Sequence, residues 1–275
     1  MSYEQRVKER IVKSLPERFR YGCYRGKAYP HICIEKDYNF IDRVAQKWNV
    51  LKGNLKPSKI KYHTEGTHMN SSQVMCINFF MKFFESPEKE HVLLATLRRC
   101  GLQIANDLSV ENAVLEYAPD WEERTNFDFF LALSDGTQIS FEVKYTENEF
   151  GGVKADPKDP DKYVRKWRDV YEELIKSCIH SRIQNMTPDE YYGHYQICRN
   201  ITYARKADDI VVFLTPREND MLDAERDYID GFNSPNIRNL YWEDVLMVLE
   251  AACSSDADMA DYFARFKDKY FPEEH

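Results

Sequence analysis

Residues 126–145, which read NFDFFLALSDGTQISFEVKY, constrain the fold of this chain more than any other stretch. Two runs rich in β-branched and aromatic residues flank the segment 134–137, whose Asp-Gly pair is a strong turn signal. The pattern predicts two strands, over about 126–133 and 137–145, joined as a hairpin.

Acidic residues fall on one face of this predicted hairpin. Strand side chains alternate between the two faces of a sheet, so Glu142 and Lys144 lie opposite Phe141 and Val143, and Asp128 can share their face. Two carboxylates on an apolar sheet repel each other, and burying them is costly unless a cation compensates. A divalent metal supplies that compensation, and oxygen ligands of this kind suit Mg²⁺ or Mn²⁺. We therefore expect a metal site with Lys144 beside it.

This stretch resembles the core of the PD-(D/E)XK nuclease superfamily. Asp128 stands for the motif aspartate, and residues 142–144 stand for the E-x-K triplet, whereas Phe127 replaces the proline that often precedes the aspartate. The triplet is short and also occurs on solvated hairpin faces. The hairpin alone therefore leaves both interpretations open.

The rest of the chain predicts a matching order of elements. A buried helix starts near Asn70, a further helix follows Pro87, and a strand covers about 112–118 ahead of the hairpin. After the hairpin come an amphipathic helix over 163–178, a helix from 187 that runs through YYGHYQICRNITYARKA, and a buried strand over 210–215. This gives an α/β fold with a restriction-endonuclease-like αβββαβ core, in which helices flank a mixed sheet. Helices over 1–15, 41–51 and at the C-terminal end are additions to it.

The similarity covers roughly residues 66–250 and points to a restriction-endonuclease-like branch of the superfamily. The segments that carry it are HMNSSQ at 68–73 with Asn78, VLEYAPD at 114–120, RTNFDFF at 124–130, FEVKYTE at 141–147, YQICRN at 195–200 and VVFLTP at 211–216.

The resemblance implies metal-dependent hydrolysis of phosphodiester bonds. Asp128 and Glu142 would ligate Mg²⁺ or Mn²⁺, helped by the backbone carbonyl of Val143. Lys144 would orient the attacking water, assist its deprotonation or stabilise charge on the phosphate. Glu116, on the neighbouring strand, is either a further metal ligand or a solvated glutamate.

Polar side chains from other segments would surround this centre. Gln73 and Asn78 interrupt an apolar helix and either face the site or satisfy local backbone groups. On the helix from 187, one face carries Gln196, Asn200 and Tyr203, with Arg199 alongside. The resemblance implies that Gln73, Gln196 and Arg199 position phosphate or water. Glu147 is either a rim residue or a loop charge.

Charge and length set limits on partners and organisation. The net charge of −8 is unfavourable for a nucleic-acid binder, but basic residues cluster just after the hairpin and could contact nucleic acid. They are Lys154, Lys158, Lys162, Arg165, Lys166 and Arg168, and interspersed aspartates leave a solvated loop as the alternative. We expect a mixed N-terminal extension over 1–66, a nuclease core over 67–253 and a C-terminal helix over 254–275 packed on the core.

The N-terminal region and the cysteines add little. Seven scattered cysteines form no C-x-x-C pair, which favours reduced thiols, and a charged N-terminus without an apolar signal region favours a cytoplasmic protein. A zinc site could be assembled from Cys23, His31, Cys33, His63 and His68, but this set lacks the two tight ligand pairs of structural zinc sites. No stretch approaches the length of a membrane span.

The sequence thus favours a DNA endonuclease of restriction, repair or mobile-element type. One alternative is a non-catalytic nucleic-acid-binding or assembly module that keeps the fold. Another is a helix-rich interaction protein in which the Asp-Glu-Lys set is coincidental. The target, DNA against RNA and endonuclease against exonuclease action stay undecided, and a homodimer remains open.

Overall fold

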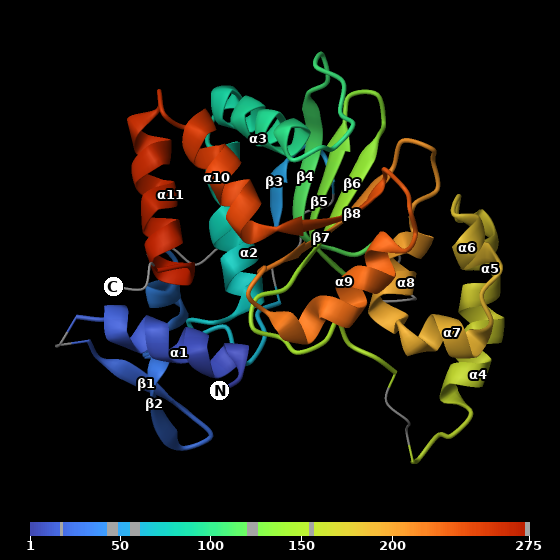
Figure 1. The fold of residues 1–275 in the computed structure, drawn as a ribbon, viewed down its shortest axis with the longest axis horizontal. Helices are drawn as coiled ribbons and strands as arrows, with labels where there is room; N and C mark the ends of the chain where they lie inside the picture. The colour runs from blue at the N-terminus through green and yellow to red at the C-terminus, as the bar shows by residue number, and fades with distance from the viewer. Residues whose placement is uncertain (17–18, 43–48, 56–60, 120–125, 154–156, 273–275) are drawn as a thin grey trace.

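A six-stranded sheet between two helical layers forms the body of the molecule (Figure 1). The computed structural model describes residues 1–16, 19–42, 49–55, 61–119, 126–153 and 157–272. In spatial order the strands are β3 (Val50–Lys52), β4 (Val110–Tyr117), β5 (Phe127–Leu133), β6 (Gln138–Val143), β7 (Ile210–Thr215) and β8 (Ile237–Tyr241). Pairing is antiparallel from β3 to β6 and parallel from β6 to β8. The prediction of an α/β fold with a mixed sheet is confirmed.

The predicted hairpin is the pair β5–β6. Phe129 lies opposite Phe141 and Ala132 opposite Gln138. Gly136 has a φ of 84°, a left-handed conformation that favours glycine and closes the turn. The second strand ends at Val143, two residues earlier than predicted. The N–H of Lys144 still donates to the Leu214 carbonyl of β7, but the N–H of Tyr145 donates to the side chain of Glu147.

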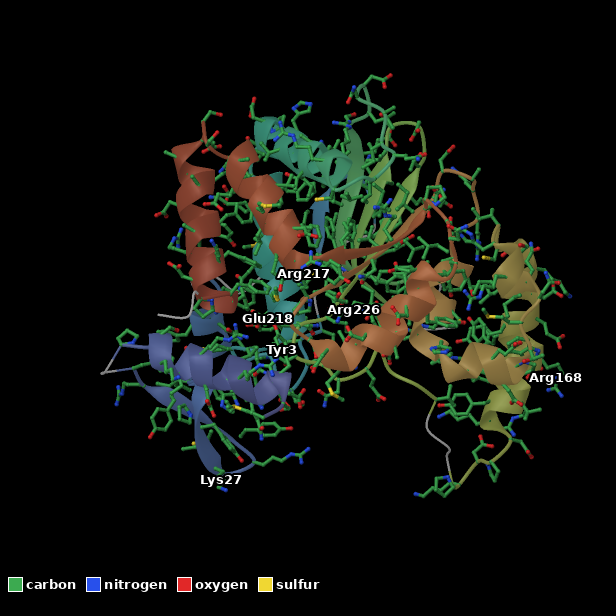
Figure 2. All side chains as sticks on the ribbon, viewed as in Figure 1. Tyr3, Lys27, Arg168, Arg217, Glu218 and Arg226 are labelled. Atoms are coloured by element: carbon green, nitrogen blue, oxygen red, sulfur yellow. The ribbon has the colours of Figure 1, made fainter. Side chains whose placement is uncertain are left out.

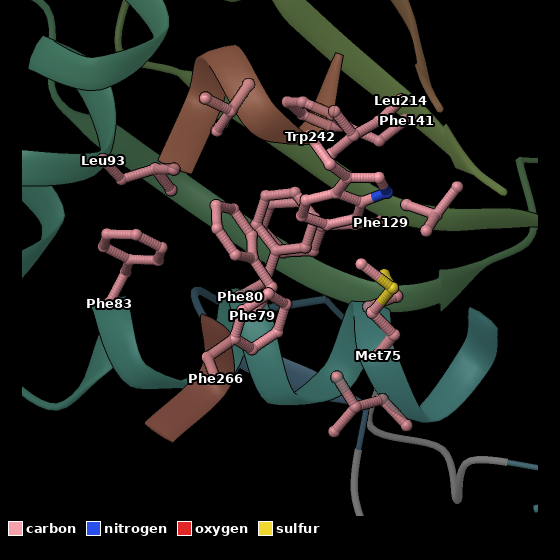
Figure 3. Close-up of a cluster of buried hydrophobic side chains, with 14 of the residues drawn as sticks. Met75, Phe79, Phe80, Phe83, Leu93, Phe129, Phe141, Leu214, Trp242 and Phe266 are labelled. Atoms are coloured by element: carbon pink, nitrogen blue, oxygen red, sulfur yellow. The ribbon is translucent and has the colours of Figure 1, made fainter. Parts of the chain in front are cut away.

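Helices α2 (Ser72–Met81), α3 (Pro87–Arg99), α10 (Trp242–Ala252) and α11 (Ala257–Tyr270) cover one face of the sheet (Figure 1). Aromatic side chains fill the space between them (Figure 3). Phe80 of α2 stacks on Phe129 with ring centroids 3.8 Å apart, and Phe79 meets Trp242 edge-on at 5.0 Å. This packing explains why almost every side chain of α2 is buried, as its sequence predicts.

Shorter helices cover the other face and connect β6 to β7. They are α4 (Lys162–Lys166), a π-helical turn (Trp167–Tyr171), α5 (Glu172–Ser177), α6 (Ser181–Gln184), α7 (Pro188–Gly193) and α8 (Tyr195–Thr202), with α9 (Asp223–Asp230) after β7. The single helix expected from 187 onward is wrong. It breaks at His194, whose φ of −125° and ψ of 46° are not helical, and it ends at Thr202.

The N-terminal segment packs on the sheet face that α2, α3, α10 and α11 cover. Helix α1 (Tyr3–Ser14) contacts α11, and buried Tyr3, Val7 and Ile11 join the core of that sheet face. A separate two-stranded sheet, β1 (Tyr21–Tyr24) with β2 (Lys27–Cys33), follows it, and then a 3-10 turn (Lys36–Asn39). A second 3-10 turn, Lys82–Phe84, extends α2, and a third, Asp220–Leu222, precedes α9.

The helix expected over 41–51 lies partly outside the described residues, which omit 43–48. At its end the prediction is wrong, because Val50 pairs with Val114 as part of β3. The N-terminal segment therefore supplies a strand to the sheet as well as a cover for it.

Candidate active site

Three carboxylates form a row across three adjacent strands. In the β4–β5 pairing Leu115 lies opposite Phe129 and Tyr117 opposite Phe127, which puts Glu116 level with Asp128. In the same way the β5–β6 register carries Asp128 to the level of Glu142. Residues directly opposite each other in antiparallel strands point to the same face. We call Glu116, Asp128 and Glu142 the acidic row.

Glu116 sits in an unusual backbone conformation. Its φ of 54° is left-handed, which is rare for a residue inside a strand and costs free energy. Its carboxylate accepts hydrogen bonds from Gln73 Nε2 at 2.8 Å and from Asn126 Nδ2 at 2.5 Å. The first of these bonds ties the start of α2 to the end of β4. These hydrogen bonds therefore stabilise the strained backbone of Glu116 at one end of the acidic row.

Asp128 lies at the centre of the row with little compensation for its charge. One oxygen accepts the backbone N–H of Val143 at 2.7 Å. Burial and the negative charges of Glu142 and Glu116 raise the pKa of Asp128 well above its ordinary value, and Lys144 offsets this only in part. This environment favours either protonation of Asp128 or the binding of a cation beside it.

Glu142 is held by three donors. Lys144 Nζ lies 2.7 Å from Oε1, which also accepts from Gln196 Nε2 at 2.5 Å, and Asn200 Nδ2 donates to Oε2 at 2.8 Å. Gln196 and Asn200 are one turn apart on α8, so they reach the strand from the same helix face. Gln196 Oε1 also accepts from Lys144 at 3.0 Å, which closes a ring of contacts.

Lys144 stays charged in this setting. Burial opposes the ammonium form, but Glu142, Glu147 and Asp128 outweigh it and raise the pKa of Lys144. The lysine is 8% exposed, so its charge acts on the interior of the site more than on bulk solvent.

Asp128 and Glu142 of the acidic row line a cavity of about 460 Å³, whereas Glu116 lies outside its wall. Its wall is strongly polar, and it is lined by Glu4, His63, Glu65, His68, Asn70, Ser71, Ser72, Gln73, Asp128, Glu142, Val143, Lys144, Thr146, Glu147, Asn148 and Gln196. Two side-chain atoms of this wall, Nε2 of His68 and Oδ1 of Asn70, are buried without a hydrogen-bond partner among the described residues. Such atoms are unsatisfied until a ligand or water occupies the cavity.

The donor set fits a hard divalent cation. Asp128 and Glu142 offer carboxylate oxygens at the cavity wall, and burial together with the neighbouring carboxylates raises the pKa of Asp128. In the described part of the chain, no group of three or more His, Cys, Asp or Glu side chains is arranged so that it could hold a metal ion. An ion here would therefore use two carboxylates and complete its shell with water or phosphate oxygens, as Mg²⁺ commonly does.

Several side chains expected around the site are brought to it. Gln73 contacts Glu116, and Gln196 contacts Glu142. Glu147 lines the cavity, accepts a hydrogen bond from Ser72 and so fastens the start of α2 to the chain after β6. Asn200 is the partner that the sequence placed on the right helix face without giving it a role. Its spacing of four residues from Gln196 was the available signal.

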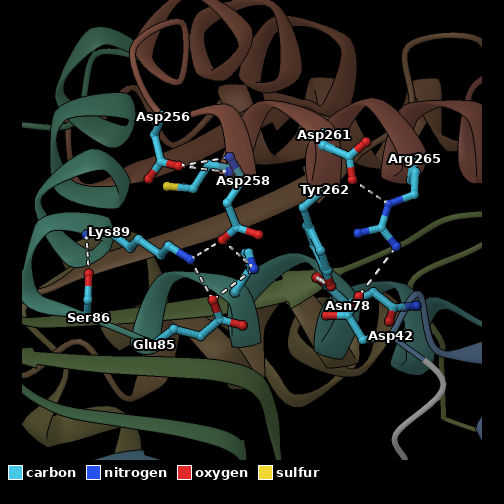
Figure 4. Close-up of polar contacts among 12 residues, drawn as sticks. Asp42, Asn78, Glu85, Ser86, Lys89, Asp256, Asp258, Asp261, Tyr262 and Arg265 are labelled. Atoms are coloured by element: carbon cyan, nitrogen blue, oxygen red, sulfur yellow. Dashed lines mark hydrogen bonds and ion pairs between the residues drawn. The ribbon is translucent and has the colours of Figure 1, made fainter.

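Asn78 does not reach the acidic row. Its Nδ2 donates to the Tyr270 hydroxyl at 2.8 Å and to the Asn39 carbonyl at 3.2 Å, and its own carbonyl accepts from Tyr262 (Figure 4). It instead fastens α2 to α11. The expected position beside the metal is corrected because this side of α2 faces the C-terminal helix.

Arg199 is not among the residues that line the cavity. Its guanidinium carbon lies 5.2 Å from the centre of the Tyr195 ring. The expected place of Arg199 at the cavity wall is therefore corrected.

The basic segment lies on and before α4. Arg165 forms an ion pair with Asp159 at 2.5 Å, and Lys166 donates to the Tyr195 hydroxyl at 2.8 Å. Lys158 and Lys162 are exposed, and Lys154 lies outside the described residues. Part of the local positive charge is thus neutralised within the protein.

A family model described as restriction endonuclease associating with ARP matches residues 13–271. The chain belongs to this family. The mixed sheet flanked by helices fits a restriction-endonuclease-like fold, and the family indicates a nuclease-like function. Neither a search of curated proteins nor a search of solved structures finds a match. In the described ranges, no helix has the length and apolar character needed to cross a membrane.

Proposed function

We propose that this chain is a metal-dependent nuclease that hydrolyses phosphodiester bonds, acting as a DNA endonuclease of restriction, repair or mobile-element type. The observation that carries the proposal is the acidic row with Lys144 at one end, of which Asp128 and Glu142 line a polar cavity. Family membership supports it, because a restriction-endonuclease-like family implies a DNA substrate. The PD-(D/E)XK interpretation, with an αβββαβ core, accounts for both observations.

In this proposal Asp128 and Glu142 hold Mg²⁺ or Mn²⁺, together with the Val143 carbonyl, and Glu116 adds negative charge from the next strand. Such an ion, when bound, polarises the phosphate and makes its bound water more acidic. Gln196 and Asn200 keep the Glu142 carboxylate in place, since each donates a hydrogen bond to it.

Lys144 would act as a charged donor. Because its pKa is raised, it would be a poor base at neutral pH, and it could instead hold a water or stabilise negative charge on the phosphate. Phosphate charge is spread over several oxygens in the transition state, so a fixed ammonium inside a cavity is well suited to this role.

The basic segment over 154–168 is proposed to contact the DNA backbone, with Lys158 and Lys162 exposed for this purpose. A cytoplasmic location and a homodimer that cuts both strands are part of the same hypothesis.

One observation favours the alternative of a non-catalytic nucleic-acid-binding or assembly module. Both oxygens of Glu142 already accept hydrogen bonds inside the protein, from Lys144, Gln196 and Asn200. A metal ion must compete with these donors for the oxygens of Glu142. A protein in which the metal never displaces them would bind DNA without cutting it.

Cleavage of closed circular and linear DNA in Mg²⁺ or Mn²⁺ separates these two functions. We expect the wild-type protein to cut closed circles. Lys144→Ala should lower the rate on the order of 10²–10⁴-fold. Lys89→Ala, which removes a lysine from an ion-pair cluster elsewhere, is the matched control and should cut normally.

Equal cleavage by wild type and Lys144→Ala would refute the assigned site. DNA binding in EDTA with no turnover in either metal would favour the non-catalytic module.

A further inference from the structure

The β1–β2 hairpin is a basic island in an acidic protein. Residues 19–34 include Arg20, Arg25 and Lys27 and contain no Asp or Glu, although the whole chain carries a net charge of −8. All three cations are exposed. Within the described part of the chain, none of them pairs with a carboxylate. The positive charges of these three side chains are therefore available to a partner.

The turn of this hairpin places cations at its tip. Tyr24 lies opposite Lys27, so Arg25 and Gly26 are the two central turn residues, with φ values of 49° and 76°. Two consecutive left-handed residues define the tight turn whose twist suits a β-hairpin. Gly26 adopts this conformation readily, whereas Arg25 does so at a cost. A residue that is unfavourable for the turn but exposes a guanidinium indicates selection for something other than stability.

The hairpin contacts residues that line the active-site cavity. Tyr24, which flanks the turn, donates its hydroxyl to Glu65 at 2.9 Å, and its ring meets His68 edge-on at 4.9 Å. His68 also forms a β-bridge with Ile32 of β2. Both Glu65 and His68 line the cavity. The turn with Arg25 is therefore held beside the cavity wall, at the edge of the molecule (Figure 1).

We propose that the β1–β2 hairpin enters a groove of duplex DNA and holds it across the cavity through Arg20, Arg25 and Lys27. This inference rests on the proposed nuclease function and names the part of the chain that grips the substrate. The major groove of B-DNA, about 12 Å wide, admits a two-stranded β-ribbon. Arg25 and Lys27 lie at the turn and Arg20 directly precedes β1, so the cations are available to phosphates at both ends of the hairpin.

The hairpin and the basic segment after β6 are two separate basic regions. In Figure 2 Lys27 of the hairpin lies at the lower left of the molecule, and Arg168, at the end of the basic segment, lies at its right edge. Charge complementarity favours a polyanion such as DNA as the partner, because the hairpin carries only positive charge in a chain whose net charge is −8.

The test measures binding without cleavage. A fluorescent duplex is titrated with the full-length protein in EDTA, and again in Ca²⁺, over a range of salt concentrations. The test variant carries Arg25→Gly and Lys27→Gln. Glycine suits the left-handed turn position, so this variant should be at least as thermally stable as the wild type. The matched control carries Arg99→Gln and Lys206→Gln, which remove two exposed cations at the end of α3 and before β7.

We expect the hairpin variant to bind duplex on the order of tenfold more weakly at about 0.1 M salt. The slope of log affinity against log salt should fall by about 2, since each phosphate contact contributes about 0.9. The control should change affinity by less than about twofold.

Duplex binding by the hairpin variant that equals the control, in both affinity and salt slope, would overturn the inference and leave the nuclease proposal standing. A hairpin variant that binds duplex normally, and binds only single-stranded DNA or a protein partner more weakly, would also overturn the inference and leave the nuclease proposal standing. A wild-type protein that binds no duplex in either condition would contradict both proposals.

Discussion

Two polar clusters lie near the two ends of α2, and they differ in how their charges balance. At the outer cluster, Lys82 and Lys89 each contact both Glu85 and Asp258 at 2.5–2.8 Å (Figure 4). Two ammonium groups face two carboxylates, and the acidic partners are 45% and 63% exposed. This cluster is neutral and complete.

The acidic row sets three carboxylates against the single ammonium of Lys144. Here Asp128 and Glu142 line a cavity, and the pKa values of Asp128 and Glu116 are raised chiefly by burial. The outer cluster lowers the pKa of Asp258 to about 2, through hydrogen bonds from Lys82 and Lys89. The comparison teaches that a buried charge excess, rather than the number of charged residues, marks the functional site.

Removal of a lysine should separate the two clusters most strongly. Lys144→Ala leaves Glu142 buried with amide donors only, so we expect the free energy of unfolding to fall by about 3 kcal/mol. Lys89→Ala leaves Lys82 between the same carboxylates and should cost less than about 1 kcal/mol. Urea denaturation of metal-free protein at neutral pH measures both. Similar losses would mean that the two clusters are equivalent.

Removing the negative charge of Asp128 should raise the free energy of unfolding, by less than the loss of Lys144 lowers it. The folded-state pKa of Asp128 lies above its ordinary value of 3.8, so its contribution to stability is present below that pH and is lost as pH rises through the raised pKa. Asp128→Asn keeps an acceptor for the Val143 N–H and removes the charge. Without metal at neutral pH it should therefore stabilise the protein by about 0.5–2 kcal/mol, and this gain should vanish in acid.

Asp258→Asn is the control with the reversed sign. Because the pKa of Asp258 is lowered, its contribution is present above pH 3.8 and disappears as pH falls towards about 2. The thermal midpoint of Asp258→Asn should therefore drop at neutral pH and match the wild type in strong acid. A destabilised Asp128→Asn at neutral pH would show that the row holds no excess charge.

The sequence predicts the centre of the fold well because its signals are local. The β5–β6 hairpin is defined by alternation and an Asp-Gly turn, and β7 by a short apolar run. Strand β8 was missed because Ile237 and Leu240 are its buried positions, a spacing without strand alternation. Its backbone is fixed by parallel pairing with β7, which lies outside the reach of local patterns.

For the site, the sequence identified the residue types but not all of the contacts. Asp128, Glu142 and Lys144 come from one hairpin, so their proximity follows from local geometry, whereas the contact of Gln196 with Glu142 joins residues 54 positions apart. Asn78 looked equivalent to Gln73, but its partner Tyr270 lies 192 residues further along the chain. The left-handed backbone of Glu116 likewise depends on tertiary contacts, and nothing in its sequence neighbourhood predicts it.

Mn²⁺ binding in the absence of DNA tests the central claim, that the acidic row is a metal site, most directly. Calorimetric titration of wild type, Asp128→Asn and Asp258→Asn would be run side by side at neutral pH. We predict that the wild type and Asp258→Asn bind Mn²⁺ alike and that Asp128→Asn binds more than about tenfold more weakly. Equal binding by Asp128→Asn, or no binding by the wild type, would contradict the account.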